Sequence, residues 1–223
     1  CRASHPWTCL FPMTADFAHV HTHTHASAYD GVGRHEEFVA KAKAMGHDAI
    51  AFTDHGSLRG LYEAHEACKK HEIKLIPGLE AYLCDDIDRK GLTDEERKQI
   101  KLDYPLPEDR KRVLAAEDSK RSDRDHITLW ALNDKGLQNL FKLTSISWIR
   151  GFYSKPRIDM KLLAEYAEGV AASTGCVSGV VAKPLRDGNP IEAERRLQRL
   201  GEIFPSRFYV EIMPHVPPGT EGV

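Results

Sequence analysis

The chain has 223 residues, of which 41% are hydrophobic and 29% are charged, and its formal net charge is -2. This balance is typical of a globular protein of one domain, and the absence of a basic excess gives no argument for a nucleic-acid-binding surface. No apolar run reaches the roughly 18 residues of a membrane span. The five cysteines show no CxxC spacing, which disfavours a disulfide framework or a zinc ribbon and indicates a reducing, cytoplasmic setting.

The ends of the sequence differ from the region between them. Residues 1–12 have no periodicity and no signal-peptide pattern, so we interpret them as a foreign or upstream segment. We expect one domain over residues 13–223, with residues 85–125 as an insertion dense in charge of both signs. The proline- and glycine-rich last stretch follows directly on a predicted strand. We therefore expect the domain to be incomplete at its C-terminus.

Four histidines alternate in the first predicted strand, at positions 19, 21, 23 and 25. In an extended strand, side chains two positions apart share a face, so the four rings would line up on one side. Neutral imidazole is a common metal ligand, and alternate strand positions can bring two rings onto one ion. The run therefore predicts a metal site; the alternatives are a solvated histidine-rich strand and a tag remnant.

The segments that follow alternate between helices and strands. After a turn at residues 30–33, the periodicity predicts a helix at 36–45, a strand at 49–53, a helix at 58–71, and strands at 73–76 and 79–83 that Pro77 and Gly78 separate. In the charged insertion we expect one short exposed helix at 108–116, with the rest mobile.

The pattern beyond the insertion predicts a strand at 126–132, a helix at 134–148 with Phe141 among its core residues, a helix at 160–168, a strand at 170–173, a helix at 190–203 and a strand at 207–212. About seven strands thus alternate with helices, and the sequence has no GxGxxG or P-loop motif. This order favours an α/β fold of the parallel β/α-barrel type over an open doubly wound sheet.

Candidate metal ligands lie at or near the ends of these strands. They are His21, His23, Asp30, His55, Glu80, His126 and Cys176. In a barrel, strand ends converge on one mouth, and histidine and cysteine mixed with carboxylates suit zinc, manganese or iron better than calcium. A carboxylate among histidines can bridge two ions, as in two-metal phosphoesterases. Taken singly, His55 could cap a helix, Glu80 could pair with a lysine and Cys176 could pack as a small apolar residue.

Several motifs resemble those of the PHP (polymerase and histidinol phosphatase) domain. They are Phe17–Thr24 with Ser27 and Asp30-Gly31, Thr53-Asp54-His55-Gly56, and Pro77–Tyr82. Residues 126–129, 151–159 and 173–179 further resemble the version of this domain at the N-terminus of bacterial replicative DNA polymerase III alpha subunits. The resemblance extends from about residue 17 to residue 215.

The resemblance implies a distorted seven-stranded β/α (TIM-like) barrel that holds two to three divalent metals, of zinc, manganese or iron. It implies the same seven ligands, with Glu80 bridging two ions and with catalytic roles for Glu80, His21 and His55. His19 matches a position where polymerase relatives often have histidine, whereas His25 matches no ligand position. Asp54 would orient or neighbour His55. The family completes its site with an Asp-x-His pair in a TNDxHY-like motif beyond residue 215. Either this pair lies downstream of Val223, or the last ligands are lost.

The function implied by the resemblance is that of the N-terminal PHP domain of a bacterial or phage DNA polymerase III alpha subunit. The parent protein would be a Mg-dependent DNA-directed DNA polymerase. This piece would at most hydrolyse phosphoesters, for example as a 3′–5′ proofreading exonuclease. Implied partners are DNA through the parent, the polymerase core in cis and a proofreading subunit, with no membrane. The alternatives are a free-standing phosphatase of the histidinol-phosphate type and a metal-stapled structural module.

Overall fold

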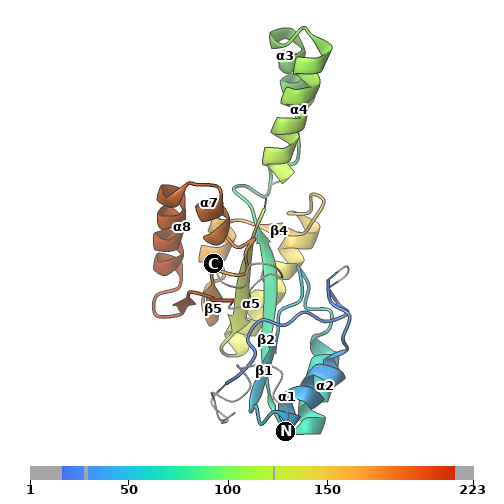
Figure 1. Ribbon diagram of the computed structural model, residues 1–223, viewed down its shortest axis with the longest axis vertical. Helices are drawn as coiled ribbons and strands as arrows, with labels where there is room; N and C mark the ends of the chain where they lie inside the picture. Colours follow the sequence, from blue (N-terminus) through green and yellow to red (C-terminus); the bar gives the residue numbers. More distant parts are fainter. Residues whose placement is uncertain (1–16, 28–29, 123, 214–223) are drawn as a thin grey trace, which may run out of the picture. The chain divides into compact units, whose positions relative to one another are not determined.

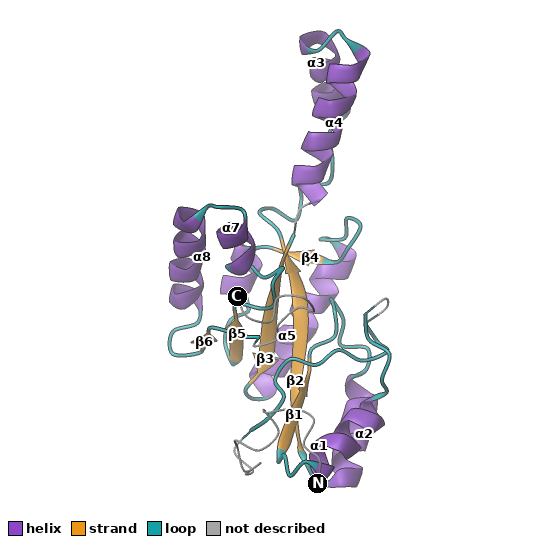
Figure 2. Ribbon diagram, in the orientation of Figure 1, coloured by secondary structure: helices purple, strands orange, loops and turns teal. Residues whose placement is uncertain are grey.

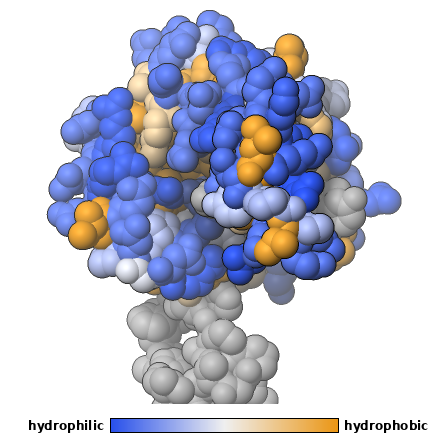
Figure 3. Space-filling model, turned by 90° about the horizontal axis from the view of Figure 1, so that it is seen from above, coloured by the Kyte–Doolittle hydropathy of each residue, from blue (hydrophilic) through white to orange (hydrophobic). Residues whose placement is uncertain are grey.

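The computed structural model describes residues 17–27, 30–122 and 124–213, which form a mixed α/β fold (Figures 1 and 2). These residues contain six strands and eight helices. The chain divides into two compact units, residues 1–79 and 80–223. The face drawn in Figure 3 is mainly hydrophilic, with hydrophobic side chains scattered over it. Within the described ranges, no helix has the length and hydropathy to cross a membrane.

The first unit builds its core between two helices and a parallel strand pair. It contains α1 (His35–Ala44), β1 (Ala49–Phe52), α2 (Leu61–His71) and the first half of β2 (Lys74–Leu83). The buried residues of both helices recur three or four positions apart, as expected for amphipathic helices. The core consists of Val39, Ala42, Ile50, Phe52, Ala64, Ala67, Cys68 and Ile73.

The histidine run is not a regular strand, so that prediction was wrong. In the described residues it makes one isolated parallel bridge, between His19 and Ile50. The chain then turns back on itself, because the amide of Ser27 donates to the carbonyl of Thr24 and the amide of His25 donates to the carbonyl of Gly33. This turn removes the strict alternation that would place four rings on one face.

β2 is a single strand, although we predicted two separated by Pro77 and Gly78. A proline cannot donate to a strand ladder, which is why it normally indicates a strand end. Here Pro77 stays in register opposite Phe52 of β1, and the strand continues. The second half of β2 pairs in parallel with β4 (Arg157–Ile158).

The second unit surrounds the second half of β2. β3 (Asp125–Ala131) lies between β2 and β5 (Val170–Ser173), and β6 (Phe208–Tyr209) follows β5. β3 and β5 are antiparallel, whereas β5 and β6 are parallel. The seven-stranded barrel therefore stays a prediction.

The remaining helices are α3 (Asp94–Asp103), α4 (Pro107–Ser122), α5 (Asp134–Ile149), α6 (Met160–Glu165), α7 (Ala182–Arg186) and α8 (Pro190–Ile203). The predictions for α5, α8 and β5 are confirmed to within one residue at each end. Phe141 was wrongly assigned to the core, since it is 46% exposed and Leu143 is buried instead. Helix α7 was not predicted.

The charged insertion forms two helices, α3 and α4, where we predicted one short helix. They make a hairpin (Figure 1), and Arg97 lies 3.5 Å from Asp118 across it. Thr93 and Glu96 form a reciprocal capping box at the start of α3. No residue of α3 is buried. Its caps and good helix formers, rather than an apolar face, explain why hydrophobic periodicity did not predict it.

Arg157 is fully buried on β4 and connects the surrounding loops by hydrogen bonds. Its guanidinium donates to the carbonyls of Gly151 (3.0 Å), Ile87 (3.1 Å) and Arg89 (3.3 Å). It also lies over the ring of Tyr153, at 5.3 Å from the centroid. Three carbonyls in different directions match the fork of a guanidinium and not the single ammonium of a lysine.

We therefore expect Arg157→Lys to lower the free energy of unfolding by about 2 kcal/mol, because at least one buried carbonyl loses its donor. Urea denaturation measures this change. The matched control is Arg195→Lys on α8, where the side chain is 68% exposed and we expect a change within about 0.5 kcal/mol. Equal effects at the two positions would contradict the role assigned to Arg157.

Candidate metal centre

His21 and His23 point their Nε2 atoms at each other. The two atoms are 3.1 Å apart, and the ring planes are inclined by 58°. Two imidazole nitrogens bound to one tetrahedral zinc ion lie about 3.3 Å apart, given Zn–N bonds of about 2.0–2.1 Å. Both rings are half-buried. Without a metal, one Nε2–H donates to the other nitrogen; a metal ion would take the place of that proton.

The hydrogen bond of the second His23 ring nitrogen, Nδ1, indicates which nitrogen carries the proton. Nδ1 of His23 lies 3.0 Å from Oγ of Ser27, and that hydroxyl lies 2.6 Å from Oδ1 of Asp54. The Asp54 carboxylate only accepts, so Ser27 donates to Asp54 and must accept from Nδ1–H of His23. The Nε2 lone pair of His23 is thus left for a metal.

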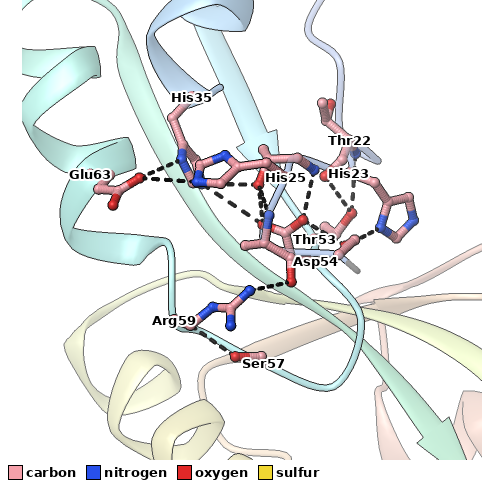
Figure 4. A network of polar contacts seen from close by, with 12 residues as sticks. Thr22, His23, His25, His35, Thr53, Asp54, Ser57, Arg59 and Glu63 are labelled. Carbon is pink, nitrogen blue, oxygen red and sulfur yellow. Dashed lines mark hydrogen bonds and ion pairs between the residues drawn. The ribbon is translucent and has the colours of Figure 1, made fainter. Parts of the chain in front are cut away.

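Asp54 is buried and accepts from several donors at once (Figure 4). Besides Ser27, the amide of Thr24 donates to it at 2.7 Å and the Thr24 hydroxyl donates at 2.9 Å. Burial alone would raise the pKa of Asp54. The neighbouring His35 and these donors outweigh burial and lower the pKa to about 2. The carboxylate therefore stays ionised and keeps the network in one arrangement.

The pH dependence of stability should report on this carboxylate. The pKa of Asp54 is depressed from 3.8 to about 2, so its stabilisation is complete above about pH 4 and is lost as the pH falls through 2. We expect the metal-free chain to lose about 2 kcal/mol of unfolding free energy there that Asp54→Asn does not lose. Urea denaturation from pH 7 to pH 2 in a chelator measures it. Parallel pH profiles of the two proteins would contradict it.

His55 and Asp30 complete the cluster of the first unit. Nε2 of His55 lies 2.6 Å from Oδ2 of Asp30, and its ring stacks on that of His23 at 4.2 Å between centroids. The His55 amide donates to Oγ of Ser27 at 3.0 Å. Ligand atoms of His23, Asp30 and His55 all lie within 4.8 Å of one another. This spacing suits one divalent ion with two nitrogen ligands and one oxygen ligand.

Gly56 allows the chain to turn sharply directly after His55. It follows His55 directly and has φ +57°, in the left-handed region that residues with a Cβ rarely adopt. The chain can therefore leave β1, present His55 and turn toward α2 within a few residues.

In the second unit, His126 at the start of β3 gathers two more predicted ligands. Nδ1 of His126 lies 2.9 Å from Oε1 of Glu80 and 3.4 Å from Sγ of Cys176. Glu80 and Tyr82 are two positions apart on β2, and the ring of Tyr82 meets that of His126 edge-on at 5.2 Å. Glu80 is fully buried. A buried carboxylate needs a positive charge beside it, from a proton on His126 or from a metal.

The loop that carries Cys176 is held against His126 by the backbone. The amide of His126 donates to the carbonyl of Ser178 at 3.0 Å, and the amide of Val180 donates to the carbonyl of His126 at 2.9 Å. Gly175, at φ +72°, makes the turn just before the cysteine. Burial alone would lower the pKa of His126. Its contacts with Cys176 and Glu80 outweigh burial and raise the pKa to about 9, so the pair attracts positive charge.

Comparison with known proteins shows the family of this chain. The model of the PHP domain matches residues 19–215 of the chain. The chain belongs to the PHP domain family. The DNA polymerase III alpha subunits of Aquifex aeolicus, Saccharopolyspora erythraea and Mycobacterium tuberculosis are similar to it, with 36%, 37% and 34% identity over 211, 202 and 210 residues. These matches cover 94%, 89% and 90% of this chain but 16% of each relative's length.

Each of the two units contains some of the predicted ligands of this PHP domain. Four lie together in the first unit: His21, His23, Asp30 and His55. The other three, Glu80, Cys176 and His126, lie together in the second unit. The bridging role of Glu80 stays a prediction. Residue 215, the end of the matched stretch, lies outside the described residues.

Other residues have contacts that were not predicted from the sequence. His19 packs beside Phe17 and His47, and burial together with His47 lowers its pKa. Ser27 connects Asp54 to His55, because its hydroxyl donates to Asp54 and accepts from the His55 amide. Ser27 was part of a motif in the sequence, but its role was not predicted. The available signal was that Ser27 lies four positions after His23, a spacing at which a turn can bring the two side chains together.

Proposed function

We propose that this PHP domain binds divalent transition metals and hydrolyses phosphoesters, as the N-terminal domain of a DNA polymerase III alpha subunit. The observation that carries the proposal is the facing pair of His21 and His23, whose nitrogens have the separation of ligands on one ion. Soft and borderline nitrogen and sulfur donors mixed with carboxylates suit zinc, manganese or iron. The donor set of both clusters therefore fits the metals that the family resemblance implies.

The roles of the residues follow from their contacts. Divalent ions, when bound, neutralise phosphate charge and make water a better nucleophile. His21, His23, Asp30 and His55 would hold such an ion in the first unit. Ser27 fixes the His23 ring so that Nε2 stays unprotonated. In the second unit, Glu80, His126 and Cys176 supply one anionic oxygen, one nitrogen and one sulfur. Among these residues we assign catalytic roles to His21, His55 and Glu80.

The polymerase context of the domain is also proposed from its relatives. The chain spans about one sixth of the polymerase III alpha subunits that it matches. The parent protein would extend DNA with Mg²⁺ in the cytoplasm, with the polymerase core in cis and a proofreading subunit as partners. In the complete protein, we propose that the domain closes as the seven-stranded barrel of its family.

The activity is tested with a primer that carries a 3′ mismatch. The chain, and a version extended past residue 223, are incubated with Mn²⁺ or Zn²⁺, and release of the terminal nucleotide is followed. The proposal predicts metal-dependent hydrolysis by the extended form. Absence of hydrolysis by the extended form would contradict the exonuclease assignment.

A structural role is the second candidate, because the ligands are part of the folded network. Ser27 contacts His23, Asp54 and the His55 amide at 3.0 Å or less. An ion on His23 would thus also stabilise the turn. If the metals only staple the domain, chelation lowers the melting temperature and removes no hydrolytic activity.

A further inference from the structure

A second group of metal-ligating side chains lies in the first unit and shares no residue with the ligand set above. It consists of His25 in the turn after the histidine run, His35 at the start of α1 and Glu63 in α2. Oε2 of Glu63 lies 3.3 Å from Nδ1 of His35 and 3.7 Å from Nε2 of His25 (Figure 4). Their ligand atoms all lie within 4.8 Å of one another.

The His35 side chain is 2% exposed, and its Nδ1 makes no hydrogen bond despite its proximity to Glu63. Its other nitrogen, Nε2, lies 3.4 Å from the hydroxyl of Thr24 and 3.8 Å from Oδ2 of Asp54. The Thr24 hydroxyl already donates its proton to Asp54, so toward Nε2 of His35 it can only accept. The negative charge of Asp54 also favours a proton on Nε2. That tautomer leaves the Nδ1 lone pair facing the Glu63 carboxylate.

A lone pair and a carboxylate oxygen repel each other at 3.3 Å unless a positive charge lies between them. The positive charge is either a second proton on His35 or a metal ion. A proton shared by His35 and Glu63 needs no third ligand, whereas a metal ion does. The nearby His25 ring therefore favours the metal ion. Ligand atoms around a tetrahedral zinc lie about 3.3 Å apart. The Glu63 oxygen lies 3.3 Å from the His35 nitrogen and 3.7 Å from the His25 nitrogen, close to that separation.

The surroundings leave room for His35 and orient it. Gly60 packs against the His35 ring so closely that a Cβ there would lie 2.4 Å from its Nε2. Asp54 behind the ring provides the carboxylate that commonly accompanies a histidine ligand on the side away from the metal. The cluster thus has two imidazoles, one carboxylate and a position open to solvent through the exposed Glu63.

We propose that His25, His35 and Glu63 bind one divalent transition-metal ion of the zinc class. This ion would be additional to any ion bound by the family ligands. It would connect the turn after the histidine run to α1 and α2. Two histidines and one carboxylate prefer Zn²⁺ over Mg²⁺ or Ca²⁺, which take oxygen ligands.

The test counts zinc ions bound to the chain after metal removal, by titration with Zn²⁺ against a coloured chelator. Glu63→Gln and His25→Gln each remove one donor at an exposed position, so the fold should be kept, as far-UV circular dichroism checks. We expect each variant to bind one zinc ion fewer than the unmodified chain, or to bind it at least about 10-fold more weakly. Glu66→Gln and His65→Gln, at exposed positions of the same helix, should bind as the unmodified chain does.

A further variant separates this site from the proposed function. His21→Ala with His23→Ala removes family ligands and should leave the additional ion in place. The inference is overturned if Glu63→Gln and His25→Gln bind as many zinc ions, as tightly, as the unmodified chain. It is also overturned if the His21→Ala, His23→Ala chain binds no zinc, since the cluster would then not hold a metal by itself.

Discussion

A chain in which His21 and His23 are both replaced by alanine should lose metal-dependent phosphoester hydrolysis while keeping its fold. The Nε2 atoms of the two rings are 3.1 Å apart, close to the separation of two nitrogen ligands on one zinc ion. Removing a group that only supports a ligand typically costs 10–100-fold in metal affinity or activity, so loss of two ligands should cost more than about 100-fold. Initial rates with Mn²⁺ on the mismatched primer, in the extended form, measure the effect.

The matched control for this double variant is His65→Ala, which removes an exposed imidazole from α2. It should retain the full rate. Circular dichroism and the melting temperature show whether the double variant is folded. Full activity in the double variant would mean that the facing pair is not part of the reacting centre. Loss of folding without a prior activity to lose would favour the structural role.

The second large effect is expected from Asp54→Ala. Three donors would lose their acceptor: the Thr24 amide, the Thr24 hydroxyl and the Ser27 hydroxyl. Each buried donor left unsatisfied costs about 1–3 kcal/mol, so we expect the free energy of unfolding to fall by about 4 kcal/mol. Urea denaturation in the presence of a chelator measures this change without a contribution from bound metal.

The network also predicts an order among variants. Ser27→Ala removes only one of the donors to Asp54, so its cost should be smaller, about 1–2 kcal/mol. Asp48→Ala is the control, because the Asp48 side chain is exposed and should change stability by less than about 0.5 kcal/mol. A loss at Asp54 no larger than the loss at Asp48 would show that this buried carboxylate does not organise the turn.

The sequence predicted which candidate ligands lie close together better than it predicted their geometry. Alternation in the histidine run pointed to His21 and His23, and the structure does bring them together. The reason was wrong, however, because the run is not a strand. The position of Ser27 depends on a hydrogen bond to Asp54, which is 27 residues away. No local pattern encodes such a contact, so neither the turn nor the location of the His23 proton could be predicted.

The same distinction explains the errors in the fold. Helix α8 was predicted correctly because Asn189 caps it, Pro190 begins it and apolar residues recur along one face. Pro77 indicated a strand end, but pairing with β1 keeps it inside β2. Local propensity is overridden there by a neighbouring strand that lies more than 20 residues earlier in the chain.

The most direct test of the account is the metal content of the purified chain. After incubation with Zn²⁺ or Mn²⁺ and dialysis against metal-free buffer, elemental analysis counts the ions that remain. We predict that the unmodified chain retains bound transition metal and that His21→Ala with His23→Ala retains fewer ions. An unmodified chain that retains no ion, or a double variant that retains as many as the unmodified chain, would contradict the assignment of these histidines as metal ligands.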